Sequence, residues 1–151
     1  MQAVVQHLQG LATGAFVIYV TADRPWSVMA KRLEDATGMF AVDAISGANG
    51  MVNQARQDGV MFLQSPTMLE MIAMRVEQLA RRHPNAHVVV DSLNALALYN
   101  GIGPVQEFSH YLANRLRALD VSGDFIVADN AQGQALRQAV EGFVDEAVEV
   151  A

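Results

Sequence analysis

Apolar residues along this chain form short continuous runs separated by spaced stripes, and this pattern predicts strands that alternate with helices. Continuous runs are typical of strands buried on both faces of a sheet. They lie at residues 15–20, 39–45, 60–63, 87–90 and 124–128, and a last strand is expected near 142–150. Stripes with helical spacing predict helices. They lie at residues 1–11, 26–37, 66–83, 104–119 and 131–140.

The alternation favours a mostly parallel sheet with right-handed crossovers. We therefore expect an α/β fold with three layers, in which helices cover both faces of the sheet. The sequence contains no internal repeat, linker or low-complexity tract. Its 151 residues fit one domain of ordinary size, so residues 1–151 are expected to form a single domain.

Small polar or acidic residues follow the predicted strands. These residues include Asp23, Ser65, Asp91 with Ser92, and Asp129. In a parallel sheet they would line one edge, and α/β sheets bind ligands just beyond the carboxyl ends of their strands. This rim is therefore where a functional site is expected.

Two interpretations of Asp91 are open. It ends a run of valines at the position where nucleotide-hydrolysing folds place a magnesium-binding carboxylate, although an isolated carboxylate binds magnesium weakly. Alternatively, Asp91 and Ser92 cap the turn that follows. Asp23 is either a general base after a strand or the N-cap of a helix that begins at residue 24 or 25. Ser65 is predicted to cap a helix that begins at Pro66.

The composition narrows the functional classes. Hydrophobic residues make up 52% of the chain and charged residues 17%, which suggests a sheet covered on both faces or a face covered by a partner. The net charge of −6 does not favour nucleic acid, which requires clustered Lys and Arg. No cysteine is present, so disulfides and thiolate metal sites are excluded. The apolar runs are too short to span a bilayer and no signal peptide is apparent, so the expected location is the cytoplasm.

Several catalytic motifs are missing from the sequence. The only lysine, Lys31, has no glycine-rich segment beside it, so no phosphate-cradling loop is present. The four histidines do not have the spacing of a zinc site, and no nucleophile elbow occurs. We therefore predict no catalytic residue, no metal site and no cofactor.

Taken together, several segments resemble the RecA-superfamily ATPases of the KaiC type. The likeness is closer to archaeal relatives described as inactivated and implicated in signal transduction. It covers nearly the full length from Gly14. It is carried by residues 19–25, 65–67, 90–100, 108–117 and 143–146, and the stretch from 90 to 117 is the most specific.

The resemblance implies a RecA-like fold in which Asp91 matches the Walker B carboxylate. In active members a phosphate-binding loop precedes the helix that corresponds to residues 1–11, and this chain begins after that loop. Active members also carry acidic residues that activate water after the strand at 15–20, where this chain has only Asp23. The resemblance therefore implies a protein that has kept the RecA-like fold but lacks the loop that binds the phosphates of the nucleotide.

These observations lead us to expect a non-catalytic regulatory or scaffolding module that acts in signal transduction. Loss of an internal strand would expose edge hydrogen bonds, so a protein partner or a homo-oligomer is expected. An alternative is a residual nucleotide-binding protein or ATPase subunit, in which Asp91 and Asp23 hold magnesium and a partner supplies the loop. A third class is a hydrolase that uses Asp23, Asp91 and Asp129 at the rim.

Overall fold

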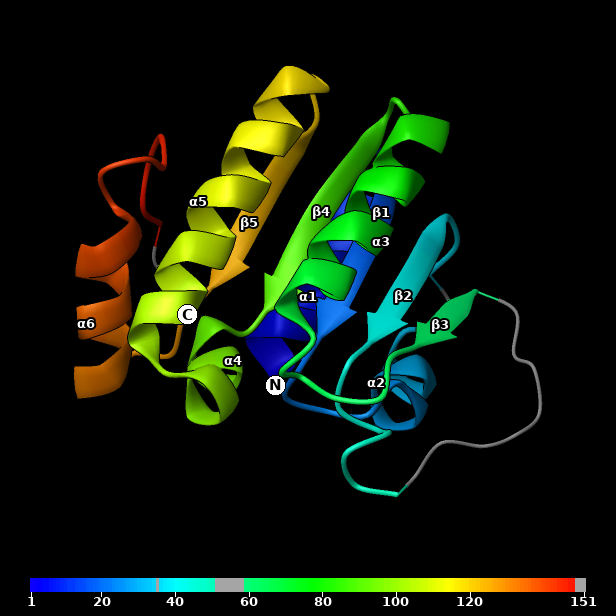
Figure 1. Cartoon of the computed structure of the whole chain (residues 1–151). Coiled ribbons are helices and arrows are strands. Elements are labelled where there is room, and N and C mark those ends of the chain that lie inside the picture. Colours follow the sequence, from blue (N-terminus) through cyan, green and yellow to red (C-terminus); the bar gives the residue numbers. More distant parts are fainter. Residues whose placement is uncertain (35, 51–58, 149–151) are drawn as a thin grey trace.

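Five parallel strands form one sheet in the computed structural model of the chain, which describes residues 1–34, 36–50 and 59–148 (Figure 1). The strand order is β3-β2-β1-β4-β5. The strands are β1 (Phe16–Thr21), β2 (Met39–Asp43), β3 (Val60–Phe62), β4 (Ala86–Asp91) and β5 (Ser122–Ile126). The helices are α1 (Gln2–Ala12), α2 (Trp26–Arg32), α3 (Leu69–Arg82), α4 (Leu93–Asn100), α5 (Ile102–Ala118) and α6 (Ala131–Val140). The predicted α/β class is confirmed.

Helices cover both faces of the sheet and give the three layers expected from the sequence. Leu8 of α1 and Met29 of α2 share one core cluster with Tyr19 of β1. Ile72 of α3 and Leu112 of α5 belong to a second cluster on the other face. Figure 1 shows α3 and α5 in front of the strands and α1 behind them.

The position of strand β1 in the middle of the sheet explains why its residues form a continuous apolar run. Successive side chains of a strand point to opposite faces. Val17 and Tyr19 enter the cluster with α1, whereas Ile18 and Val20 enter the cluster with α3 and α5. All four side chains are fully buried, so neither face of this stretch offers a solvent-exposed position for a charged residue.

Some boundaries differ from the sequence-based expectation. Helix α2 ends at Arg32 instead of residue 37, and α3 begins at Leu69 instead of Pro66. Strand β5 begins two residues earlier than expected. The strand expected near 142–150 is wrong for residues 142–148, which contain only turns and irregular backbone, and residues 149–150 lie outside the described residues.

The sequence pattern did not reveal helix α4. Its sequence, LNALALYN, has apolar residues on all sides, so it has no stripe with helical spacing. Leu93, Leu96 and Ala97 are buried, whereas the Leu98 side chain is 76% exposed. Among the described residues, no helix is both long enough and apolar enough to cross a membrane.

Candidate functional site

The three central strands end level with one another at the carboxyl edge of the sheet. Thr21 of β1 is in register with Asp43 of β2 on one side and with Asp91 of β4 on the other. All three side chains are buried. The expected polar rim therefore exists, and its centre consists of one hydroxyl group and two carboxyl groups that face the protein interior.

Asp91 is held by a tyrosine from the neighbouring strand. Tyr19 is in register with Val89, and residues 89 and 91 point to the same face of β4, so the Tyr19 ring reaches diagonally to Asp91. The Tyr19 hydroxyl donates a hydrogen bond of 2.6 Å to Asp91 Oδ2. Both side chains are almost fully buried. This contact orients the carboxyl group towards the core.

Burial sets the protonation of this pair. Loss of solvation raises the pKa of Asp91, and the hydrogen bond from Tyr19 and the charge of Arg24 only partly oppose that shift. Burial and the nearby carboxyl group also raise the pKa of the Tyr19 hydroxyl. Tyr19 therefore remains a hydrogen-bond donor at neutral pH, and the buried carboxyl group has an increased preference for its protonated form.

Arg24 supplies the positive charge in front of Asp91. Its Nη1 atom lies 3.9 Å from Asp91 Oδ2, and its Nη2 atom lies 3.9 Å from Asp23 Oδ2. The Arg24 side chain is 27% exposed, whereas Asp91 is 2% exposed. The guanidinium group therefore faces one buried and one exposed carboxyl group.

Asp23 does not play the capping role considered for it. The N-cap residue of α2 is Pro25, and the first helical amide, Trp26 N, donates a hydrogen bond of 2.8 Å to Asp43 Oδ2. The Asp23 side chain is 47% exposed and faces Arg24. Asp23 is therefore an exposed member of the rim.

Asp43 is the structural anchor that the sequence reasoning missed. Its Oδ1 atom accepts hydrogen bonds from the amides of Ile45 and Ser46, both at 2.9 Å. Its Oδ2 atom accepts from Trp26 N and from the Ser46 hydroxyl. One buried carboxyl group thus connects the end of β2, the following loop and the start of α2. The signal in the sequence was weak, because Asp43 lies inside the apolar run 39–45 and is followed by Ala44 and Ile45, whereas Asp91 is followed directly by Ser92.

Ser92 and Asp91 have different roles. The Ser92 hydroxyl accepts a hydrogen bond from Ala95 N at 3.1 Å and caps α4. The peptide bond between Asp91 and Ser92 is cis. The capping interpretation is therefore confirmed for Ser92, whereas the Asp91 side chain turns to Tyr19 instead.

Ser65 and Asp129 lie at the two ends of the rim, because β3 and β5 are the edge strands of the sheet. The predicted helix cap at Ser65 is wrong, since its hydroxyl accepts from Thr67 N at 3.1 Å within a turn that precedes α3. Asp129 is exposed, and the neighbouring Asn130 caps α6 by accepting from Gly133 N at 2.8 Å. Neither residue joins the buried group around Asp91.

A second polar cluster connects α1 to the sheet. His7 Nε2 of α1 and His87 Nε2 of β4 lie 2.7 Å and 2.8 Å from the same oxygen, Asp124 Oδ2 of β5. Burial raises the pKa of Asp124, but the two imidazole hydrogen bonds outweigh it and hold this pKa below its ordinary value. The cluster therefore fastens the first helix to strands β4 and β5.

The resemblance implies magnesium beside Asp91, and the residues present do not fit that ion. Magnesium prefers ionised oxygen ligands in octahedral geometry and keeps several waters. Asp91 is buried, one of its oxygens accepts from Tyr19, and a cationic guanidinium group stands 3.9 Å away. Within residues 1–34, 36–50 and 59–148, no three or more His, Asp or Glu side chains are grouped to hold a metal ion.

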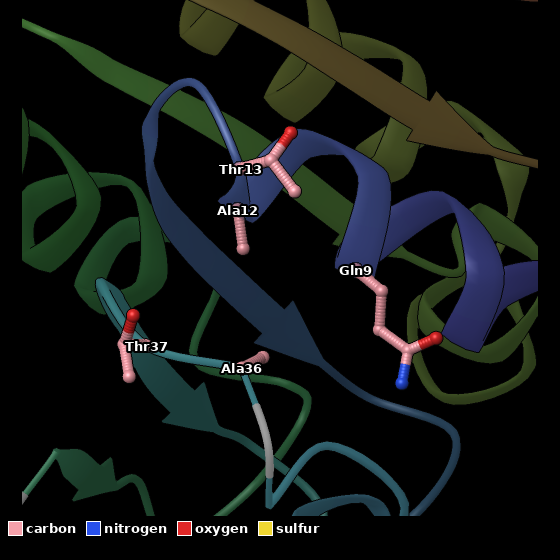
Figure 2. A pocket seen from close by; sticks show the side chains of 5 residues that line it. All are labelled: Gln9, Ala12, Thr13, Ala36 and Thr37. Carbon is pink, nitrogen blue, oxygen red and sulfur yellow. The ribbon is translucent and has the colours of Figure 1, made fainter.

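A hollow on the described surface lies away from this rim. It has a volume of about 410 Å³ and lies between the end of α1 and the segment before β2 (Figure 2). Gln9, Ala12, Thr13, Ala36 and Thr37 line it. These side chains are uncharged, so the hollow offers none of the acidic groups of the carboxyl edge.

No known protein family and no curated protein sequence matches this chain. Fold and site together define a class: a parallel three-layer α/β protein whose central strand-end carboxyl groups are buried and bonded internally. The relationship to RecA and KaiC remains a hypothesis from the sequence.

Proposed function

We propose that this chain is a non-catalytic, degenerate RecA/KaiC-like domain that acts as a regulatory or scaffolding interaction module in signal transduction. One observation carries the proposal: the Walker B-like Asp91 is buried and is engaged by Tyr19. A carboxylate that works on substrate or metal must reach it within hydrogen-bond or coordination distance. Asp91 is turned away from solvent, which favours a structural role.

Asp43 supports the same proposal. It is fully buried and accepts four hydrogen bonds from its own loop and from α2. The Asp43 carboxyl group therefore has a structural role at the carboxyl edge, as proposed for Asp91. Asp23 and Asp129 remain at the exposed part of the rim, in the segments that follow two different strands, β1 and β5.

Exposed apolar side chains support a role in binding another protein. Leu98 is 76% exposed, Tyr99 42% and Ile102 40%, all within five residues at the junction of α4 and α5. Large exposed apolar groups that gather on a surface mark interaction sites. Asn100 fixes this junction, because its side-chain amide donates to the Pro66 carbonyl oxygen at 3.0 Å.

A pair of surface variants tests the proposal. Leu98→Glu should leave the thermal unfolding temperature unchanged and abolish self-association, or binding of the partner recovered with the wild-type chain, in sedimentation velocity. Tyr111→Ser removes a comparably exposed side chain, 54% exposed, from the middle of α5 and serves as the control. If both variants associate as the wild type does, the apolar junction is not the interaction surface.

A second candidate function is residual nucleotide binding with a phosphate loop supplied by a partner. The observation that favours it is the direction of α1, whose first residues lie at the carboxyl edge of the sheet (Figure 1). Amino ends of helices attract phosphate groups. Calorimetry with magnesium and ATP separates the two candidates, since only this one predicts saturable binding that Asp91→Ala abolishes.

A further inference from the structure

We propose that Arg24 is the built-in counter-ion of Asp91, and that its guanidinium group keeps divalent cations away from the carboxyl edge of the sheet. This inference rests on the proposed function, because it supplies the reason why a Walker B-like carboxylate would hold no metal. It assigns a specific role to Arg24, for which the resemblance implies none.

The guanidinium group lies between two carboxyl groups. Nη1 faces Asp91 Oδ2 and Nη2 faces Asp23 Oδ2, each at 3.9 Å. A divalent cation shared by these two carboxylates would have to occupy the same space. Arg24 is thus an internal cation at the position where the family resemblance implies a metal.

The turn between β1 and α2 presents the side chain. The Thr21 hydroxyl donates to the Arg24 carbonyl oxygen at 2.5 Å and accepts from Arg24 N at 3.3 Å. Thr21 itself is fully buried, and Pro25 starts α2 directly afterwards. The backbone of Arg24 is therefore fixed by bonds that do not involve its guanidinium group.

The contact with Asp91 is electrostatic. At 3.9 Å the two atoms are beyond hydrogen-bond distance. The Nη1 atom is buried and has no hydrogen-bond partner among the described residues. Because the backbone is held independently, a neutral side chain at position 24 should leave the fold intact and remove only the positive charge.

Removal of that charge should create a cation site. Asp91 and Asp23 would then lose the guanidinium group that lies between them, with the more weakly acting N-terminal ammonium group as the remaining positive charge near Asp91, and hard divalent cations prefer carboxylate oxygens. In Arg24→Gln we expect one Mn²⁺ to bind at least about tenfold more tightly than in the wild type. The double variant Arg24→Gln/Asp91→Asn should lose this gain.

The experiment is a Mn²⁺ titration in which electron paramagnetic resonance measures the free ion. Tb³⁺ luminescence is a second readout, because Trp26 lies near the site with its ring 6.2 Å from that of Tyr19 and can sensitise a bound lanthanide. Arg82→Gln removes the same charge from the last turn of α3 and is the matched control. Circular dichroism establishes that each variant is folded.

A folded Arg24→Gln variant that binds Mn²⁺ no more tightly than the wild type and Arg82→Gln overturns the inference and leaves the proposed function standing. Asp91-dependent Mn²⁺ binding by the wild type overturns the inference and also counts against the proposed function. If Arg24→Gln does not fold, Arg24→Met preserves the apolar stem of the side chain and is titrated in its place with the same expected gain.

Discussion

The hydrogen bond between Tyr19 and Asp91 should contribute measurably to stability. Tyr19→Phe removes only the hydroxyl group from a fully buried ring, so the packing of the ring is kept. The buried Asp91 carboxyl group then loses its donor at 2.6 Å. A buried polar group without its partner costs about 1–3 kcal/mol, and we expect the free energy of unfolding to fall by that amount. For a chain of this length, this lowers the unfolding temperature by about 2–12 °C.

Asp91→Asn tests how the protonation of Asp91 contributes to stability in the same contact. Because burial raises the pKa of Asp91 above its ordinary value near 3.8, the folded state binds the proton more tightly than the unfolded state. Wild-type stability should therefore fall as pH rises from the ordinary pKa to the raised one, and stay constant above it. Asp91→Asn should lack this slope, while its amide oxygen still accepts from Tyr19.

Urea unfolding followed by the fluorescence of Trp26, the only tryptophan, measures both variants and the double variant. We expect a coupling energy of about 0.5–3 kcal/mol between positions 19 and 91. Tyr99→Phe changes an exposed ring and should stay within about 0.5 kcal/mol of the wild type. Additive effects of the two buried substitutions, or a Tyr19→Phe variant as stable as the wild type, would refute this reasoning.

Three further changes probe other parts of the fold. Asp43→Ala removes the acceptor of four hydrogen bonds and should cost at least about 3 kcal/mol in the free energy of unfolding, measured by urea denaturation; a loss under about 1 kcal/mol would contradict its anchoring role. The pKa of Asp124 is lowered, so its stabilising contribution is present above pH 3.8 and is lost as pH falls through the folded pKa. In Asp124→Asn the free energy of unfolding should therefore fall less steeply as the pH is lowered into the acid range. An unchanged fall would show that the imidazole contacts do not contribute to stability. Gly133→Ala places a Cβ atom 1.6 Å from the Ala128 carbonyl oxygen and should lower the unfolding temperature, whereas Gly142→Ala, with no atom within 4 Å, should not; equal effects would show that α6 does not pack closely against the end of β5.

The sequence predicted the architecture because each central strand is buried on both faces. Val17, Ile18, Tyr19 and Val20 leave no polar position, so the run could be recognised without any knowledge of its neighbours. Helix α4 was missed for a related reason, since its apolar residues surround it and give no periodic signal. Helix ends were misplaced where a turn such as that at Ser65 satisfies its own hydrogen bonds before the helix begins.

The candidate site was only partly predictable. The rim followed from the strand ends, because parallel strands end at the same edge. The partner of Asp91 did not, since Tyr19 is 72 residues away and is brought to it only by the register of β1 against β4. The contact of Arg24 with Asp91 could not be predicted either, because the sequence shows only that Arg24 follows Asp23. Pairings of this kind depend on three-dimensional register, which local sequence patterns do not specify.

The central claim is that the Asp91 carboxyl group is engaged inside the protein and does not hold a nucleotide-bound metal. The most direct test follows the ¹³C chemical shift of the Asp91 side-chain carboxyl group while magnesium and ATP are added. We expect this shift to stay unchanged up to millimolar ligand and to respond to Tyr19→Phe. A saturable movement of the Asp91 signal with magnesium and ATP would contradict the account.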